Sequence, residues 1–154
     1  MYMARFRYAY QYYDPKTDVR ASIRENTISH KHAREIGRAI SGLSLERAQD
    51  YLNEVVNKTR AVPFRRYKKQ VGHRSDPGVM AGRYPVKAAG EILRLLANLE
   101  SNAEFKGMDI DRIVLQNVTV HKGGLTKRFM PRAMGRATPR NDARTHVEVV
   151  GRET

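Results

Sequence analysis

The sequence predicts an α+β fold in which three helices pack on a small antiparallel sheet and a long β-hairpin projects from it. Three segments between residues 29 and 107 carry apolar side chains at helical spacing. Two later segments alternate apolar and polar side chains with a period of two, and the stretch between them is rich in arginine, proline and glycine. A length of 154 residues is that of one domain, so residues 1–154 are predicted to form a single domain.

The charge of the chain predicts a polyanionic partner. Lys and Arg number 29 against 16 Asp and Glu, which gives a net charge of +13. Such a field favours nucleic acid first and an anionic membrane surface second. The sequence has no cysteine, which excludes disulfides and Cys-based zinc sites. The N-terminus lacks the apolar run of a signal peptide and no stretch has the length of a membrane span, so we expect a cytosolic protein without a membrane partner.

The first 28 residues predict an irregular arm followed by a strand. After a "DP" turn, "SIRENTI" (residues 22–28) favours a strand. The aromatic side chains before the turn could stack on nucleic-acid bases or anchor the arm to the domain, and the sequence favours neither. These side chains are Tyr2, Phe6, Tyr8, Tyr10, Tyr12 and Tyr13.

Three helices follow. The first spans "SHKHAREIGRAISG", with Ser29 as N-cap and Gly42 just past its end. The second begins after Ser44 as N-cap, and the third, the longest, has Pro85 as its first residue and ends near Gly107. Their apolar faces consist of Ala33, Ile36 and Ile40, of Leu45, Ala48, Leu52, Val55 and Val56, and of Ala89, Ile92, Leu95, Leu96, Leu99 and Ala103.

The connection between the second and third helices, residues 60–84, is basic and rich in glycine and proline. A connection of this length without periodicity either binds a partner or is disordered. The run Arg65-Arg66-Tyr67-Lys68-Lys69 favours binding, and we expect His73 to contact RNA or to pack the loop. The only acidic residue of this loop is Asp76.

The segments "DRIVLQNVTVHK" and "RTHVEVV" are predicted strands, and residues 113–150 are predicted to form one long antiparallel hairpin. Between them, arginines recur at every fourth position: Arg128, Arg132, Arg136, Arg140 and Arg144. A helix would give this spacing, but Pro131 and Pro139 would each cost it about 3 kcal/mol. Extended arms also place every fourth residue on one face, so we expect two arms and an apex of Met130, Ala133, Met134 and Gly135.

The hairpin is predicted to bind an external anion. Ten extended residues from Lys122 to Arg132 reach about 33 Å, which is more than a small domain can cover. No acidic residue occurs from 122 to 140, so we expect no local ion pairs. A phosphate backbone would fit, because arginine pairs bidentately with phosphate. The alternative is that the arginines form a solvated or disordered run of charge without a partner. The flanking strands, the basic loop and the net charge favour binding.

No catalytic or metal site is predicted. His30 and His32 are two residues apart on a predicted helix, where they point in different directions. The clustered His73, Ser75 and Asp76 lack the distant partners that a catalytic triad needs. No phosphate-loop, dinucleotide or nucleophile-elbow motif occurs, so we expect no enzyme, cofactor, metal or small-molecule substrate.

Three segments resemble one known family. "KRFMPRAMGRATPR" with the terminal "THVEVV", "VPFRRYKKQVGHRSDPGVMAGRYPVKAAGEILRLL", and "ISHKHAREIGRAISGLSLERAQDYL" are similar to the large-subunit ribosomal protein numbered twenty-two, in its archaeal and eukaryotic form. The resemblance extends from about Arg5 to Val150, and bacterial members lack residues 60–84.

The resemblance implies a structural constituent of the large subunit in the cytoplasmic ribosome. Its partners would be 23S-type rRNA, neighbouring ribosomal proteins and the nascent polypeptide, because the family's hairpin lines the polypeptide exit tunnel. The tunnel-facing apex would be Met130, Pro131, Arg132, Ala133, Met134, Gly135 and Arg136. Lys127, Arg128, Arg132 and Arg136 match the basic positions of the family motif.

The full set of expected rRNA-binding residues joins the basic loop to the hairpin. It comprises Arg60, Arg65, Arg66, Lys68, Lys69, His73, Arg74, Arg83, Lys122, Lys127, Arg128, Arg132, Arg136, Arg140 and Arg144. Two alternatives stay open: a DNA-binding architectural protein that uses a basic β-arm, and an RNA-modifying enzyme dependent on His73 or Asp76.

Overall fold

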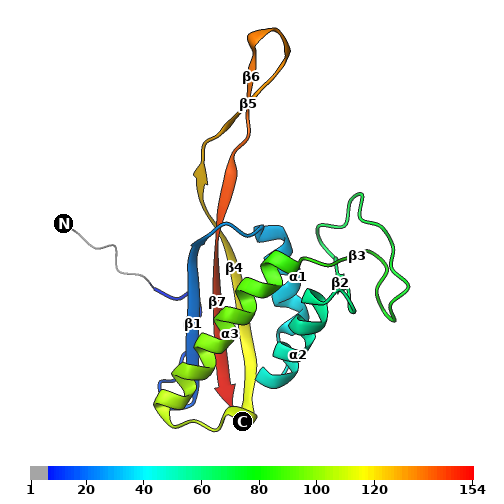
Figure 1. Ribbon diagram of the computed structural model, residues 1–154. Helices are drawn as coiled ribbons and strands as arrows, with labels where there is room; N and C mark the ends of the chain where they lie inside the picture. The colour runs from blue at the N-terminus through cyan, green and yellow to red at the C-terminus, as the bar shows by residue number, and fades with distance from the viewer. Residues whose placement is uncertain (1–6) are drawn as a thin grey trace, which may run out of the picture.

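The computed structural model describes residues 7–154 as three helices on one face of a sheet, with a β-hairpin that projects far beyond them (Figure 1). This confirms the predicted α+β fold. The main elements are β1 (Asp18–Asn26), α1 (His30–Ile40), α2 (Leu45–Val56), α3 (Val86–Lys106), β4 (Ile113–Thr126) and β7 (Asp142–Glu153). Short strands are β2 (Val62–Pro63), β3 (Gly82–Arg83), β5 (Phe129–Pro131) and β6 (Ala137–Pro139), and 3₁₀ turns are Ile110–Arg112 and Ala133–Gly135.

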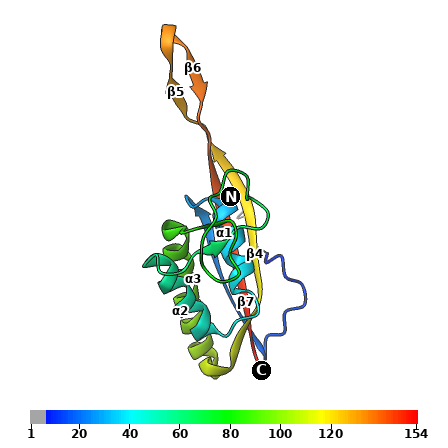
Figure 2. The same cartoon turned by 90° about the vertical axis from the view of Figure 1, so that its right-hand side faces the viewer.

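The sheet has the strand order β1-β7-β4, and both pairings are antiparallel. The last strand of the chain is therefore the central one. Val147 and Val149 of β7 are fully buried, and their alternation with polar residues turns them toward the helices. Gly151 continues this face, where a Cβ would come within 2.8 Å of Ile113. The helices lie on one side of the sheet, as Figure 2 shows.

The helices match their predicted positions because their apolar stripes form the core. Ile36, Leu52 and Leu96 are completely buried. Ser29 and Ser44 are the N-caps, although neither side chain donates or accepts a capping hydrogen bond. Pro85 is the N-cap of α3 and not its first residue, a shift of one position within the usual uncertainty of helix ends.

The structure differs from expectation in the bounds of one strand and in the presence of a short ladder. β1 begins at Asp18 and ends at Asn26, whereas the strand was predicted over residues 22–28. The cause is an ion pair: the buried carboxylate of Asp18 accepts hydrogen bonds from Arg152 Nε (2.6 Å) and Nη2 (3.0 Å), which anchor the strand's start to β7. The loop 60–84 contains the β2–β3 ladder that sequence periodicity did not indicate, because each strand has two residues.

The N-terminal arm is anchored to the sheet by its aromatic residues. Arg20 of β1 lies 4.6 Å from the ring centroid of Tyr8 and 4.4 Å from that of Tyr13. The Tyr13 hydroxyl also accepts a hydrogen bond from Lys106 Nζ at 2.7 Å. Tyr8 and Tyr13 therefore anchor the arm to the domain. Tyr12 does not share this role, because it is 82% exposed. The predicted roles of Tyr2 and Phe6 lie outside the described residues.

Candidate nucleic-acid interface

The distal hairpin arranges its arginines in facing pairs. In β5–β6, Phe129 pairs with Pro139 and Pro131 with Ala137. This register continues in both directions through backbone bonds, from Arg140 N–H to Arg128 O (2.6 Å) and from Arg132 N–H to Arg136 O (2.7 Å). Arg128 therefore lies opposite Arg140, and Arg132 opposite Arg136. Because residues four apart on a strand share a face, all four side chains belong to one face of the hairpin.

Like charges directly opposite one another destabilise a strand pair. One local acid relieves the repulsion: Asp142 Oδ2 lies 3.2 Å from Arg128 Nη1. The expectation that the hairpin has no local ion pair was therefore wrong for Arg128, because it stopped at residue 140 and the pairing brings Asp142 back beside β4. Within residues 7–154, the structure gives no ion pair to Arg132, Arg136 or Arg140. These facing arginines are therefore suited to bind an external anion.

The hairpin apex is a tight turn without a core. Met134 has φ +58° and ψ +36°, is followed by Gly135 at φ +68°, and is 94% exposed. Every residue from 131 to 142 is exposed. Phe129 is 70% exposed as well. The segment is held by backbone pairing and contributes no apolar burial to the domain.

The hairpin leaves the domain at a bulge. The register of β4 and β7 shifts between Lys122 and Leu125, which leaves Gly123 and Gly124 unpaired. A Cβ on Gly123 would lie 2.7 Å from the imidazole of His146, so only glycine fits beneath that ring. The ring is fixed from the other side, since the Glu25 N–H donates to His146 Nδ1 at 3.1 Å. The neighbouring Arg144 is half-buried and donates its Nε–H to Thr126 at 3.2 Å.

A cationic pocket of about 560 Å³ lies where the hairpin base meets the start of α1. Lys31, Lys87 and Arg128 line it, together with the one carboxylate of Asp142. Burial lowers the pKa of His30 at this site, and the charges of Lys122 and Lys31 lower it further. Burial and the two nearby cations therefore both disfavour protonation of the imidazole, as expected where the local field is positive.

The basic loop is a folded lobe fixed to α1 by a buried carboxylate. Glu35 is 1% exposed, and its carboxylate accepts hydrogen bonds from the backbone N–H groups of Arg65 (2.9 Å) and Arg66 (3.3 Å). Arg34 lies 3.4 Å from the same carboxylate. The hydrogen bonds hold the backbone, so the side chains of Arg65 and Arg66 remain exposed. Glu35 thus fixes the backbone of Arg65 and Arg66 without forming an ion pair with either guanidinium.

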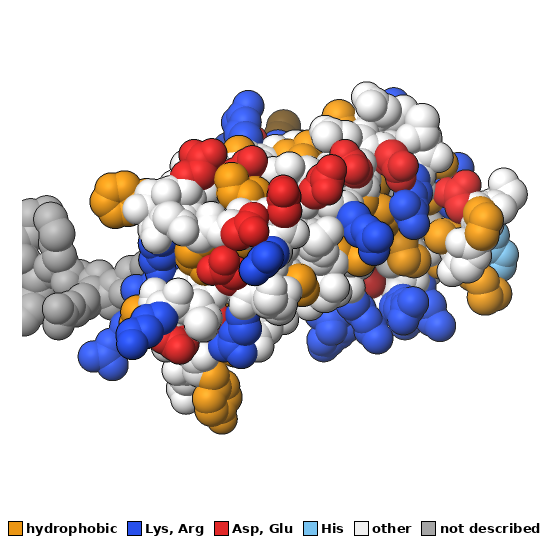
Figure 3. Space-filling view, turned by 90° about the horizontal axis from the view of Figure 1, so that it is seen from below, with side chains coloured by type: hydrophobic (Ala, Val, Ile, Leu, Met, Phe, Trp, Pro, Cys, Tyr) orange, Lys and Arg blue, Asp and Glu red, His pale blue; other side chains and the backbone are white. Residues whose placement is uncertain are grey.

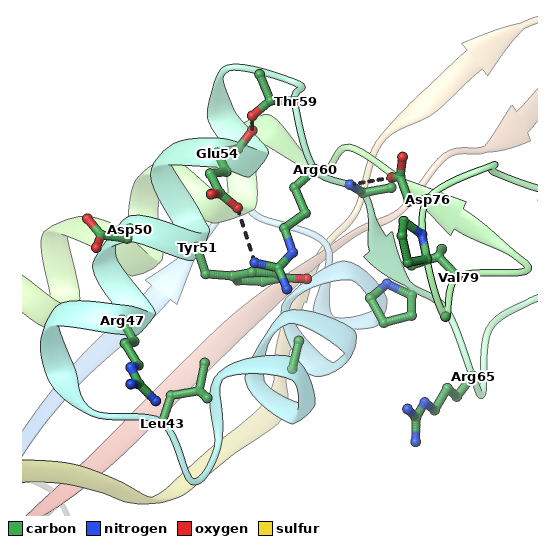
Figure 4. Close-up of a pocket in the computed structure, with 15 residues that line it drawn as sticks. Leu43, Arg47, Asp50, Tyr51, Glu54, Thr59, Arg60, Arg65, Asp76 and Val79 are labelled. Atoms are coloured by element: carbon green, nitrogen blue, oxygen red, sulfur yellow. Dashed lines mark hydrogen bonds and ion pairs between the residues drawn. The ribbon is translucent and has the colours of Figure 1, made fainter.

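The other end of the lobe is attached to α2, as Figure 4 shows. Arg60 stacks over the ring of Tyr51 at 4.8 Å and pairs with Glu54 at 3.2 Å. Asp76 accepts the N–H of Ala61 at 3.0 Å. Between α2 and the lobe lies a pocket of about 860 Å³, which these residues line. Its lining mixes acidic with basic side chains, which makes it a poor site for a polyanion.

The predicted loop residues therefore divide into two groups. Arg60, Arg74 and Arg83 make internal contacts: Arg74 Nε donates to Gly82 O at 3.3 Å, and Arg83 Nη2 donates to Gln70 O at 3.4 Å. The second group is exposed and has no ion pair in the part of the chain that the structure describes. It consists of Arg65, Arg66, Lys68, Lys69 and His73.

The structure adds basic residues that the sequence reasoning missed. Lys31, Arg34 and Arg38 lie on α1 at positions i, i+3 and i+7, which is one helical face. Arg34 and Arg38 border a groove against Val118 of β4. Helical periodicity, applied to charge as it was to apolar residues, would have identified this stripe. It joins the lobe to the base of the hairpin.

Many acidic side chains are carried by the helices. Figure 3, which views the molecule from the end opposite the hairpin, shows a band of acidic side chains with Lys and Arg side chains beside it. The acids of α2, of α3 and of the first 3₁₀ turn are Glu46, Asp50, Glu54, Glu91, Glu100, Glu104 and Asp111. By contrast, Asp76 is the one acid of residues 60–84 and Asp142 the one acid of residues 122–144, so a phosphate meets less repulsion there.

Comparison with known proteins identifies the family. The family described as Ribosomal protein L22p/L17e matches residues 21–152. The chain belongs to the ribosomal protein L22p/L17e family. The Large ribosomal subunit protein uL22 of Nitrosopumilus maritimus is 64% identical over 151 residues, which are 98% of this chain and 99% of the relative. Proteins of the same name from Archaeoglobus fulgidus (48% identity, 97% of both chains) and Methanocaldococcus jannaschii (43% identity, 96% and 95%) are also similar.

Membership of the L22p/L17e family makes the chain a structural, non-enzymatic constituent of the large ribosomal subunit, of archaeal type. The resemblance found in the sequence is thereby confirmed. Residues 7–154 contain no cluster of three or more side chains able to hold a metal ion. No helix in that range has the length and apolarity to cross a membrane.

Proposed function

We propose that this L22p/L17e protein binds large-subunit rRNA through its basic loop and hairpin, and that the hairpin apex lines the polypeptide exit tunnel. The observation that carries the proposal is the pair of facing arginine rungs, Arg128 with Arg140 and Arg132 with Arg136, on a segment outside the core. In the free protein these rungs repel one another. A phosphate backbone converts the repulsion into charge-assisted hydrogen bonds.

The exposed apex supports the second half of the proposal. Met134 and Phe129 are large apolar side chains that a free domain gains nothing by exposing. At the wall of a tunnel, RNA would cover the arginine face, while the apex from Met130 to Arg136 would meet the nascent polypeptide. Neighbouring ribosomal proteins would contact the remaining surface of the domain.

Site-specific crosslinking tests the RNA contacts. A photoreactive amino acid replaces Arg132 or Arg66 in the full chain, which is then assembled into large subunits. We expect both positions to crosslink to rRNA, whereas the same probe at Phe105, which is 93% exposed at the end of α3, does not. Recovery of the protein free of subunits at moderate salt would contradict the rRNA-binding proposal, and recovery on chromosomal DNA would support the DNA-binding alternative instead.

Crosslinking from Met134 tests the tunnel assignment separately. In ribosomes stalled during translation, a probe at Met134 should react with the nascent chain, and a probe at Leu125, which is 51% exposed near the hairpin base, should react less. Reaction at neither position, with RNA crosslinks intact, would retain the rRNA-binding proposal and reject the tunnel proposal.

A further inference from the structure

The lobe formed by residues 60–84 encloses a pocket of about 590 Å³ of its own. The lobe closes through the β2–β3 ladder and through backbone bonds from Phe64 N–H to Ala81 O and from Arg74 N–H to Met80 O, both 2.8 Å long. An isolated antiparallel β-bridge also pairs His73 with Ala81 within the lobe. The pocket is therefore part of a hydrogen-bonded fold.

The pocket has an apolar floor. Pro63, Phe64, Val71 and Met80 line it. Phe64 is held in place by the ring of His32, whose centroid lies 5.5 Å away in an edge-on arrangement. Met80, by contrast, is 74% exposed, and no packing within the described chain accounts for an apolar side chain at that position. Its flexible thioether is suited to contact an aromatic ring.

The rim of the same pocket is cationic. Arg65, Lys68, Lys69 and His73 surround the floor, and no acidic residue lines the pocket. The lobe's one carboxylate, Asp76, lines the mixed-charge pocket on the α2 side and is occupied by the Ala61 N–H. The rim is therefore not neutralised from within the lobe.

We propose that this pocket holds one unstacked nucleotide of the large-subunit RNA, with its base on the apolar floor beside Met80 and its phosphate on the cationic rim. The proposal rests on the proposed rRNA-binding function. Proteins recognise single-stranded RNA by placing splayed bases against flat or polarisable side chains while cations hold the backbone. An apolar peptide side chain would fill the floor but would leave the cationic rim without a counter-charge.

Chemical probing of unpaired bases tests the proposal in large-subunit RNA bound to the full chain. The wild-type protein should protect one unpaired base near the lobe, and a photoreactive residue at position 80 should crosslink to that base. Met80→Asp places a carboxylate over the floor, and we expect it to abolish this protection and to weaken binding about tenfold, as loss of one stacked base does. Met80→Leu should retain the protection.

Phe105→Asp is the matched control, because it places the same charge on another exposed apolar position, at the far end of α3. It should leave every protection unchanged. If the hairpin protects RNA but Met80→Asp changes nothing, or if position 80 crosslinks to a protein, the nucleotide pocket is refuted and rRNA binding stands. If no RNA is protected by either segment, both proposals are overturned.

Discussion

Replacement of Arg132, Arg136 and Arg140 together with glutamine tests the role of the hairpin most directly. All three side chains are exposed, and the structure pairs none of them with an acid within residues 7–154. Exposed substitutions of this kind change the free energy of unfolding by about 0.5 kcal/mol or less. The variant should therefore fold as the wild type does, and any loss of binding would come from the interface.

The expected magnitude follows from counterion release. Each phosphate contact contributes about 0.7 to 0.9 to the slope of log K against log salt concentration, so loss of three contacts lowers the slope by about 2 to 3. Over a fourfold rise in salt, the wild type should then lose about 20- to 40-fold more affinity than the variant. The measurement is an rRNA-fragment binding titration between about 50 and 200 mM salt.

A second triple variant separates local contacts from net charge. Arg47, Arg94 and Arg112 lie among the acidic residues of the helical side, and their replacement by glutamine removes the same total charge. We expect this control to keep the wild-type salt slope. Equal slopes in the two triple variants would refute the assignment of phosphate contacts to the hairpin, because the overall field alone would then explain binding.

Three further predictions concern the fold. Glu35→Gln weakens the charge-assisted hydrogen bonds to the lobe, so unfolding should become easier by about 2 kcal/mol and amide exchange at Arg65 and Arg66 should accelerate; unchanged exchange would contradict the anchoring role. Replacing residues 126–138 with a short turn should leave the melting temperature within about 5 °C of the wild type, and a fall of tens of degrees would make the hairpin a core element. Hydrogen bonds from Arg152 lower the pKa of Asp18, so its ionised form stabilises the fold above the ordinary carboxyl value of 3.8, and this stabilisation is lost as pH falls through the lowered value. Asp18→Asn should be less stable at neutral pH and should show a flatter decline in acid, as measured by urea unfolding across pH; parallel profiles would refute this account.

Helices were predictable from the sequence because their signals are local. The apolar stripes from Ala33 to Ile40 and from Ala89 to Ala103 repeat within a few residues, and Gly107 ends α3 in the left-handed conformation at φ +70°. The extended arms of the hairpin were predictable for the same reason, since Pro131 and Pro139 exclude a helix at their own positions.

Buried charges were not predictable, because their partners are distant in the sequence. Glu35 resembles any surface residue of a charged helix, and only the fold brings the N–H of Arg65 to it. Glu148 is similar: it is 3% exposed, and Arg24 and the N–H of Ala9 contact its carboxylate from segments more than 120 residues away. Sequence patterns identify which residues could bind RNA, whereas the fold decides which of them are free to do so.

The position of β7 at the centre of the sheet determines when this protein can complete its fold. The helices can form as soon as their residues are synthesised, but β1 and β4 do not pair with each other, and both wait for the final strand. That strand occupies residues 142–153, so the pairing of β1 with β7 closes a loop that contains all three helices. The sheet therefore forms by long-range contacts, which are slow relative to the local contacts of the helices.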